Sequence, residues 1–523
     1  MSPRGSRRPP LLLAVAGVAV ALLLALPLAY LVVRAGAGDA WHVVFRTRTL
    51  DLLWSTGALV AGVVAATLVV AVPLAWLVVR TDLPGRRAWA VAAALPLVIP
   101  SYVAALCLLG ALGPRGLLAD LLGRDLPELR GYWGALLALT LATYPYVFLL
   151  ASAALRDMDP ALEEASRSLG RSRAETFRRV VLPALRPSLG AGGLLVGLYV
   201  LSDFGVVSLM NYDALTRAIF LQYRSLFDRT PAAALALVLV AFTMLLLLAE
   251  SRARRRGRLH RTSPGVARAP QPLPLGRWRI PALVFCSATV GTFLVLPASV
   301  LAYWLGRGIG DGRGVEVPVR EALNSVTASG LAALVGVAAA LPLALLAVRY
   351  RSRWRTLERV AFLSNALPGI VIALALVFFA ARYAPFVYQT LTLLVLAYVI
   401  RFLPQALAAL ETALRRISPS IEEAARSLGQ REASVLVRVT LPLARSGLGA
   451  GAALVFLSAM KELPATLLLR PIGFETLATS IWRETSVASY SQAAPAALLL
   501  IVLSIPFLLL LWGDRSGTAA SGD

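Results

Sequence analysis

Long apolar stretches without a charged side chain are the feature that most restricts the fold of this chain. Residues 11–33, for example, are 23 consecutive residues without a charge. A helix needs about 20 apolar residues to cross the hydrocarbon core of a bilayer. Because that core offers no water to unpaired backbone groups, apolar stretches of this length are expected to be helices. The sequence therefore predicts an all-α polytopic membrane protein.

Twelve such stretches are expected to span the membrane, six in each half of the chain. The chain is 58% hydrophobic and only 15% charged, whereas soluble domains carry roughly 25% charged residues. The predicted spans are residues 11–33, 52–79, 88–112, 132–155, 188–210, 231–249, 280–305, 322–348, 360–381, 383–400, 446–469 and 491–511.

Positive charge is distributed unevenly between the loops that join these spans. Arginines gather in every second loop, as in the six between Arg252 and Arg261, whereas the loop 113–131 balances three arginines with three acidic residues. Positively charged loops remain on the cytoplasmic side of a membrane, so both chain termini are predicted to be cytoplasmic. Membrane topology thus accounts for the net charge of +23. We expect the chain to sit in a lipid bilayer and to have no nucleic-acid partner.

The same polar segment occurs once in each half of the chain. It reads EEASRSLG at residues 163–170 and EEAARSLG at residues 422–429, and after nine further residues VVLP or VTLP follows. Every matched position differs by 259 with no gap, and the stretch LGAG recurs at the same offset, at 189–192 and 448–451. We therefore predict a first six-helix repeat at 1–249, a basic cytoplasmic linker at 250–279 and a second six-helix repeat at 280–523. An even number of spans gives both repeats one orientation, as parallel repeats around an axis along the membrane normal.

Each repeated segment is predicted to be a short helix–turn–helix that projects into the cytoplasm. A capping residue followed by proline starts the first helix, at Asp159 and at Ser418. Gly170 and Gly429 are expected to end it, because glycine tolerates the left-handed conformation after a helix. The result is an apolar knob with a rim of glutamates, a shape that suits insertion into a partner's groove. An amphipathic helix on the membrane surface is the alternative, but the gap-free duplication favours docking.

The two segments resemble the E-A-A-x3-G-x9-I-x-L-P cytoplasmic loop of permease subunits in bacterial ABC importers. Ser166 replaces the second alanine in the first copy, and valine replaces isoleucine in both. The resemblance covers nearly the whole chain, because two permease halves are fused, and it implies the type I ABC importer permease fold in the bacterial inner membrane. The residues that it implies for coupling are Glu163, Glu164, Ala165, Gly170, Leu182 and Pro183 in the first copy, with Glu422, Glu423, Ala424, Ala425, Gly429, Leu441 and Pro442 in the second.

The partners of this chain also follow from the resemblance. It implies two copies of a cytoplasmic ABC ATPase subunit, one on each loop, and a periplasmic substrate-binding protein at the outer face. The chain itself has no G-x-x-x-x-G-K-[ST] phosphate loop, and Lys461 is its only lysine. We therefore expect a transport subunit that is not an enzyme and binds no cofactor, while the partner ATPase uses ATP.

Two acidic residues interrupt the fifth and eleventh predicted spans at matching positions. Asp203 and Glu462 differ by the same 259, and Lys461 precedes Glu462. Asp203 lies about 15 residues into its span, which is about 22 Å at 1.5 Å per residue and places it towards the outer half. Ionisable residues at that depth line a cavity or pair with another charge. The hypotheses are an acidic gate or transient cation contact along the translocation path, or a structural role with Glu462 paired to Lys461 or to an arginine.

The substrate is inferred from short phrases of sequence. SDFG at 202–205 and KELPAT at 461–466, followed by GFETL at 473–477, resemble the fused permeases of ferric iron importers. Related fused permeases carry thiamine or phosphonates, which remain the alternatives to ferric iron. An ion-coupled secondary transporter is a rival from another class. It would use Asp203 or Glu462 as its ion site, but the gap-free cytoplasmic repeat argues against it.

No catalytic or metal-binding constellation is expected. His42 and His260 stand apart from other ligand-type residues, and Cys107 and Cys286 each fall inside a predicted span. A cysteine in an apolar helix is usually a small buried side chain. The sequence therefore assigns neither catalytic residues nor a resident metal to this chain.

Overall fold

The fold consists of helices, and the long ones run back and forth along one common direction. The computed structural model describes residues 9–36, 41–113, 116–124, 129–224, 230–255, 272–312, 316–350, 354–364 and 366–516. In the first half these ranges hold α1 (Leu11–Gly36), α2 (Trp41–Val44), α3 (Thr47–Arg80), α4 (Arg86–Ala94), the 3₁₀ turn η1 (Leu95–Val98), α5 (Ser101–Leu112), α6 (Leu117–Leu122), α7 (Gly131–Asp157), α8 (Pro160–Ser168), α9 (Arg173–Thr176), the π-helical turn η2 (Phe177–Val181), α10 (Leu182–Ser202), α11 (Gly205–Leu209), α12 (Leu215–Arg224) and α13 (Thr230–Arg255).

The second half has a similar series of helices, with breaks of its own. It contains η3 (Gly276–Trp278), α14 (Arg279–Val290), the π-helical turn η4 (Gly291–Val295), α15 (Leu296–Gly310), α16 (Val319–Arg349), α17 (Arg355–Ser364), α18 (Gly369–Tyr383), α19 (Leu391–Arg416), α20 (Pro419–Ser427), α21 (Glu432–Val435), the π-helical turn η5 (Leu436–Thr440), α22 (Leu441–Leu443), α23 (Arg445–Met460), α24 (Pro464–Leu469), α25 (Leu477–Ser486) and α26 (Tyr490–Ser516).

Ten helices in the described ranges are long and apolar enough to cross a membrane. Two further pairs pass the same test together but are bent, by 101° between Thr356–Ser364 and Gly369–Tyr383 and by 71° between Glu432–Leu443 and Arg445–Met460. If each bent pair is one span, the total is twelve. The predicted all-α polytopic fold with about twelve membrane helices is therefore confirmed.

Four spans that were predicted as continuous are broken in the structure. The stretches 88–112 and 360–381 break before Pro100 and Pro368, which are the residues that precede α5 and α18. Proline lacks a backbone N–H and disfavours helical backbone in the residue before it. The prediction of two uninterrupted spans here is therefore wrong, although both prolines are visible in the sequence.

The other two breaks occur at the acidic residues of the fifth and eleventh spans. Helix α10 ends at Ser202 and α23 ends at Met460, so the predicted spans 188–210 and 446–469 are each divided. Asp203 Oδ1 accepts the backbone N–H of Val206 at 2.9 Å, and Glu462 Oε1 accepts that of Ala465 at 3.1 Å. Each carboxylate thus satisfies a backbone donor in the first turn of the short helix that follows. The acids end one helix and begin the next.

The predicted span 383–400 is misplaced in the sequence analysis. The structure places α19 at Leu391–Arg416, after a loop in which Gln389 has a φ of 54°. The Thr390 hydroxyl accepts the backbone N–H of Leu393 at 3.4 Å and starts the helix there. Hydropathy alone overlooked this cap, and it also missed the amphipathic end of the helix that continues to Arg416.

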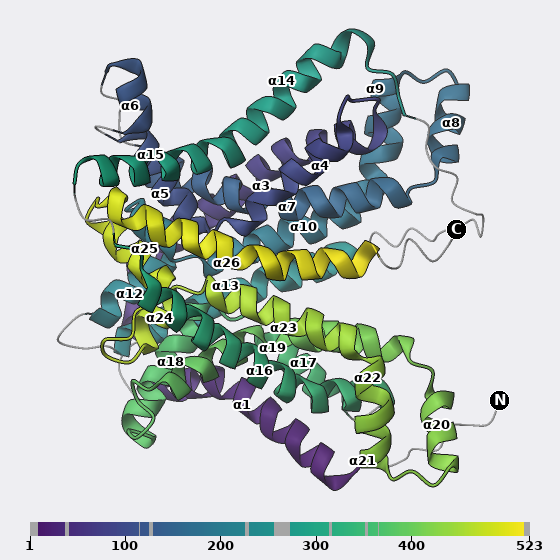
Figure 1. Ribbon diagram of the computed structural model, residues 1–523, viewed down its shortest axis with the longest axis vertical. Coiled ribbons are helices and arrows are strands. Elements are labelled where there is room, and N and C mark those ends of the chain that lie inside the picture. The colour runs from purple at the N-terminus through teal and green to yellow at the C-terminus, as the bar shows by residue number, and fades with distance from the viewer. Residues whose placement is uncertain are drawn as a thin grey trace.

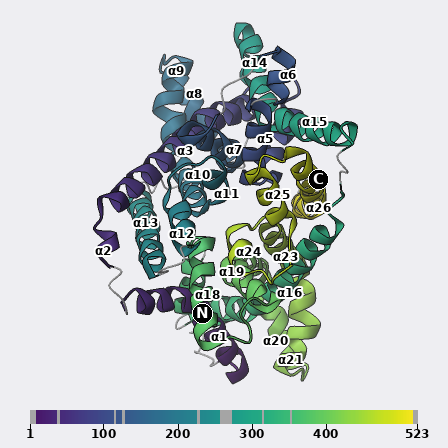
Figure 2. The ribbon, with the colours of Figure 1, turned by 90° about the vertical axis from the view of Figure 1, so that its left-hand side faces the viewer.

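The first membrane helix of each repeat packs against the opposite repeat. Helix α1 lies along α16, α17 and α18 of the second repeat, and α15 lies against α5 of the first (Figure 1; Figure 2). The Tyr30 hydroxyl donates to the Phe378 carbonyl at 3.3 Å, and Trp304 Nε1 donates to the Gly110 carbonyl at 3.0 Å. Both hydrogen bonds join one half to the other. The two repeats therefore interlock instead of lying side by side.

The predicted linker 250–279 is only partly within the described residues. Helix α13 continues to Arg255, and residues 256–271 lie outside the description. The end of the linker is fixed to the chain that follows α3: the Leu273 N–H donates to the Arg80 carbonyl at 2.8 Å, and the Asp82 N–H donates to the Leu273 carbonyl at 3.1 Å. The Leu275 N–H adds a bond of 2.8 Å to the Asp82 carboxylate. The second repeat is thus attached to the end of α3.

The recurring LGAG stretch marks a close helix contact that occurs in both repeats. A side chain at Gly192 would place its Cβ 3.0 Å from Val147, and one at Gly451 would place it 3.2 Å from Ala406. Small residues allow membrane helices to approach closely. Here they seat α10 on α7 and α23 on α19. Gly190 and Gly449, two residues earlier, have open space around the same position.

We predict that Gly192→Val and Gly451→Val each destabilise the protein, whereas Gly190→Val and Gly449→Val do not. The first pair forces bulk into a packed contact, which typically costs about 1–3 kcal/mol. Thermal unfolding of the purified protein in detergent measures the difference. Equal midpoints for all four variants would contradict this account of the helix contact.

Candidate functional site

The two repeated segments fold as the predicted helix–turn–helix. The Asp159 side chain accepts the N–H of Ala161 at 3.0 Å at the start of α8, and the Ser418 hydroxyl accepts that of Ser420 at 3.4 Å at the start of α20. Gly170 and Gly429 follow these helices with φ of 79° and 80°. The left-handed backbone at both glycines is the predicted helix end. We refer to residues 159–183 and 418–442 as the first and second coupling loops.

Both coupling loops project from the same side of the molecule, on the right in Figure 1, and are far from each other. Helices α8 and α20 lie at opposite ends of its long axis in two perpendicular views (Figure 1; Figure 2). Each loop exposes apolar side chains, with Leu169 76% and Leu428 83% exposed. Large apolar side chains exposed at a repeated position indicate a contact surface. The chain thus presents two equivalent apolar knobs.

The two glutamates of each loop face in opposite directions. Glu164 and Glu423 are exposed. Glu163 instead lies 2.9 Å from Arg80 Nη2 at the end of α3, and Glu422 lies 2.8 Å from Arg349 Nη2 at the end of α16. The expected glutamate rim is therefore correct only for Glu164 and Glu423. Glu163 and Glu422 attach the loops to the long helices of their own repeats, a role that the sequence analysis missed.

The second loop is attached more firmly than the first. Glu422 accepts hydrogen bonds from Arg349 Nε at 3.2 Å, from Arg349 Nη2 at 2.8 Å and from the Thr440 hydroxyl at 3.1 Å. Glu163 Oε1 and Arg80 Nη2 approach each other but form no hydrogen bond within the described residues. Burial raises the pKa of the Glu163 carboxyl, although the Arg80 guanidinium opposes this shift.

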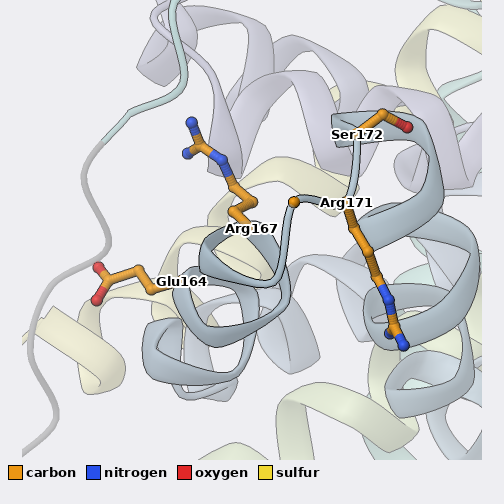
Figure 3. A pocket seen from close by; sticks show the side chains of 5 residues that line it. Glu164, Arg167, Arg171 and Ser172 are labelled. Atoms are coloured by element: carbon orange, nitrogen blue, oxygen red, sulfur yellow. The ribbon is translucent and has the colours of Figure 1, made fainter.

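A cavity opens at the turn of the first coupling loop. It has a volume of about 480 Å³ and is lined by Glu164, Arg167, Gly170, Arg171 and Ser172. In Figure 3 the side chains of Glu164, Arg167 and Arg171 point away from the turn in three different directions. Charges of both signs therefore surround the apolar knob, which suits a partner with a polar rim.

The Leu-Pro pairs of the motif connect the loops to the membrane helices. Leu182 and Pro183 begin α10 after the turn η2, and Leu441 and Pro442 begin α22 after the turn η5. Helix α10 then runs without interruption to Asp203, whereas the second repeat bends again between α22 and α23 before it reaches Lys461. Each coupling loop is thus joined by a helical segment to one of the two interrupting acids.

The two interrupting acids have different partners. Asp203 is buried, and its Oδ2 accepts a hydrogen bond of 2.5 Å from the Ser101 hydroxyl. Glu462 is also buried, but its Oε1 accepts from Arg401 Nη1 at 3.0 Å. The sequence analysis did not identify Arg401, although an arginine at the end of the predicted span 383–400 was a visible signal. The structural hypothesis raised above, in which Glu462 pairs with an arginine, is therefore confirmed. The other hypothesis, a contact between these acids and transported cations, stays a prediction.

The broken spans of the two repeats meet at this level. Lys461 Nζ donates to the Leu97 carbonyl in the break before α5, at 3.1 Å. Gly205 is enclosed by both repeats, because a Cβ there would be 2.8 Å from Tyr102 of its own repeat and 3.1 Å from Leu463 of the other. The ring of Phe204 is 6.2 Å from that of Trp482. We call this contact between the repeats the central closure.

The described residues contain no group of three or more histidine, cysteine, aspartate or glutamate side chains that could hold a metal ion. Cys107 and Cys286 are buried, as expected for apolar helices. The arrangement consists of two exposed loops and a buried contact between the repeats.

We predict that Arg349→Met loosens α20 far more than Arg80→Met loosens α8. Removing Arg349 leaves the buried Glu422 carboxylate without its cation, which costs about 3–5 kcal/mol for buried pairs. Removing Arg80 instead breaks a contact whose closest atoms form no hydrogen bond in the described structure. Amide hydrogen exchange of residues 160–170 and 419–429 measures both effects. Equal increases in the two loops would contradict the asymmetry.

Comparison with known proteins agrees with this arrangement. Two stretches, residues 59–256 and 332–515, match the family described as binding-protein-dependent transport system inner membrane component. The chain is 35% identical over 515 residues to the Fe(3+)-transport system permease protein FbpB 2 of Haemophilus influenzae, covering 96% of this chain and 98% of the relative. It is 24% identical over 444 residues to the ferric transport system permease protein FbpB of Actinobacillus pleuropneumoniae, covering 79% of this chain and 64% of that relative.

A shorter similarity involves one repeat-sized segment. The chain is 30% identical over 160 residues to the sulfate transport system permease protein CysT of Salmonella typhimurium, which covers 29% of this chain and 57% of that relative. The similarity to the Haemophilus protein extends instead over both repeats. With two matched stretches, two coupling loops and up to twelve membrane helices, the chain belongs to the inner membrane permease family of binding-protein-dependent transport systems.

Proposed function

We propose that this chain is the permease subunit of an ATP-driven importer, coupled through its two coupling loops to two copies of a separate ATPase subunit. The observation that carries the proposal is the pair of loops with matching helix ends at Gly170 and Gly429 and matching exposed apolar knobs. Two equivalent docking surfaces on one chain suit two copies of one partner. A helix whose apolar face enters a groove is a common form of such recognition.

Movement of the ATPase pair reaches the membrane through defined contacts. Glu163 and Glu422 hold the loops against α3 and α16, and Leu182 and Leu441 begin the segments that lead to the central closure. A change in the separation of the two loops therefore alters the contact between the repeats. As this contact opens and closes, the substrate path is open first to one side of the membrane and then to the other.

The orientation follows from the distribution of charge. The coupling loops and the arginine-rich loops share one side, which by the positive-inside rule is the cytoplasm. Both termini are then cytoplasmic, and a periplasmic binding protein delivers substrate at the opposite face. The chain acts as a transport subunit, while its ATPase partner hydrolyses ATP.

Ferric iron is the substrate that we infer. A relative whose name specifies Fe(3+) transport is similar to the chain over nearly the full length of both proteins, whereas the similarity to a sulfate permease is confined to a segment of 160 residues. The phrases around Asp203 and Glu462 support the same substrate. Thiamine, phosphonate or another small solute is the alternative within this mechanism.

The proposal predicts that only an iron-loaded binding protein stimulates ATP hydrolysis. The chain and its candidate ATPase are reconstituted in proteoliposomes, and a candidate ferric-binding protein is added with and without iron. We expect a several-fold increase in hydrolysis with the loaded form alone. Stimulation by a different loaded binding protein would keep the mechanism and replace the substrate. Failure of the ATPase to assemble with the chain would overturn the proposal in favour of an ion-coupled secondary transporter.

A further inference from the structure

Phenol oxygens gather around the two interrupting acids of the central closure. Tyr102 on α5 is 3% exposed and Tyr398 on α19 is 1% exposed. Tyr199 on α10 is half-buried and precedes Asp203 by about one helical turn. With the carboxylates of Asp203 and Glu462, these tyrosines bring five oxygen-bearing side chains from both repeats to one region.

Contacts between these side chains show that they form one cluster. Ser101 bonds both the Asp203 carboxylate, at 2.5 Å, and the Tyr199 hydroxyl. On the other repeat the Tyr398 hydroxyl lies 2.6 Å from the Thr466 hydroxyl, which donates to the Glu462 carbonyl at 2.5 Å. A Cβ added at Gly205 would lie 2.8 Å from Tyr102 Cβ and 3.1 Å from Leu463 Cδ2, so Tyr102 lies where the two sides meet.

One hydroxyl in the cluster has no hydrogen-bond partner. The Tyr102 oxygen is buried and unsatisfied within the part of the chain that the structure describes. Buried polar atoms are nearly always paired, so an unpaired one calls for a functional explanation. The Tyr102 hydroxyl therefore has unused hydrogen-bonding and ligand capacity at the contact between the repeats.

Phenolate and carboxylate oxygens are hard ligands that favour hard cations over soft ones. We propose that Tyr102, Tyr199 and Asp203 form a transient binding site for ferric iron on its way through the central closure, with Glu462 and Tyr398 facing it from the second repeat. This inference rests on the proposed function. Each phenol that binds iron exchanges its O–H proton for an Fe–O bond and releases the proton to water, and the iron stays ferric.

The cations around the site keep its affinity low in the closed state. Arg401 bonds Glu462 at 3.0 Å and also interacts electrostatically with Asp203. Room for its guanidinium exists only because residue 369 is glycine, since a Cβ there would lie 1.4 Å from Arg401 Nη1. A path that conducts must bind its ion weakly enough to release it. Arg401 favours the release of iron, because its guanidinium competes with iron for the carboxylates.

The two repeats differ in a way that assigns the ligand role to the first. The position that matches Arg401 by the repeat offset of 259 is Ala142. The residue that follows the proline at the break is Ser101 in the first repeat and Gly369 in the second. Asp203 is therefore bonded by a hydroxyl, whereas Glu462 is bonded by a guanidinium. A carboxylate without a directly bonded cation is the better iron ligand. Asp203 is thus the carboxylate that binds iron, and Glu462 is the carboxylate whose availability Arg401 controls.

The test uses the chain with its ATPase partner in proteoliposomes, titrated with ferric nitrilotriacetate. Iron bound to phenolate absorbs visible light by charge transfer, a signal that a purely structural tyrosine does not give. We expect this absorption in the unaltered protein, its loss in Tyr102→Phe combined with Tyr199→Phe, and at least tenfold weaker binding in Asp203→Asn. Arg401→Gln is expected to bind iron at least tenfold more tightly and to release it more slowly.

Tyr144→Phe is the matched control. Tyr144 is a fully buried tyrosine whose hydroxyl also lacks a partner in the described structure, but its ring packs on Phe293, with centroids 5.0 Å apart. This variant is expected to retain the absorption. Its loss there too would assign the signal to nonspecific iron and overturn the site.

A second readout separates this site from the proposed function. Stimulation of hydrolysis by the iron-loaded binding protein, measured on the same liposomes, reports the importer. Stimulation without any charge-transfer absorption would overturn the iron site and leave the proposed function standing. Absence of both would overturn both. Absorption that the double phenylalanine variant retains would overturn the assignment to Tyr102 and Tyr199.

Discussion

The bilayer provides no water for unpaired backbone groups, and this constraint determines where the helices of the chain are able to break. Each of the four breaks in the spans occurs at a proline or at an acid whose carboxylate binds a backbone N–H of the following helix. Asp203 and Glu462 therefore have a structural role at these breaks. The same carboxylates lie where the repeats meet. The groups that make two of the breaks possible are therefore also close to any substrate that crosses between the repeats.

The coupling loops and the central closure are parts of one connected framework. In the first repeat, Arg80 at the end of α3 contacts Glu163 of the loop, and α10 runs from the loop to Asp203. The second repeat has the same connection with an added bend and a firmer ion pair. Because α1 and α15 each pack on the opposite repeat, movement of one repeat is transmitted to the other. The repeats therefore share one framework, and they differ in the bend of the second repeat and in individual side chains.

The sequence was sufficient for the helical fold, the two repeats and the ends of the coupling helices, because hydropathy, a gap-free offset and capping residues act locally. It was insufficient for the breaks and for the partners of the acids. Proline at 100 and 368 marked two breaks, but helix ends at Asp203 and Glu462 depend on carboxylates that cap the next helix. Arg401 and Arg349 reach their glutamates across 61 and 73 residues, and no periodicity reports contacts between helices so far apart in sequence.

The central claim is that the two coupling loops transmit ATP hydrolysis to the path between the repeats. It is tested most directly by uptake and hydrolysis in liposomes with Gly170 and Gly429 both replaced by leucine. Each glycine has a positive φ and open space around it, so the change strains the turn at the helix end without a clash. The account predicts that the protein inserts and hydrolysis persists, while uptake falls at least tenfold. Normal uptake in the double variant would contradict it.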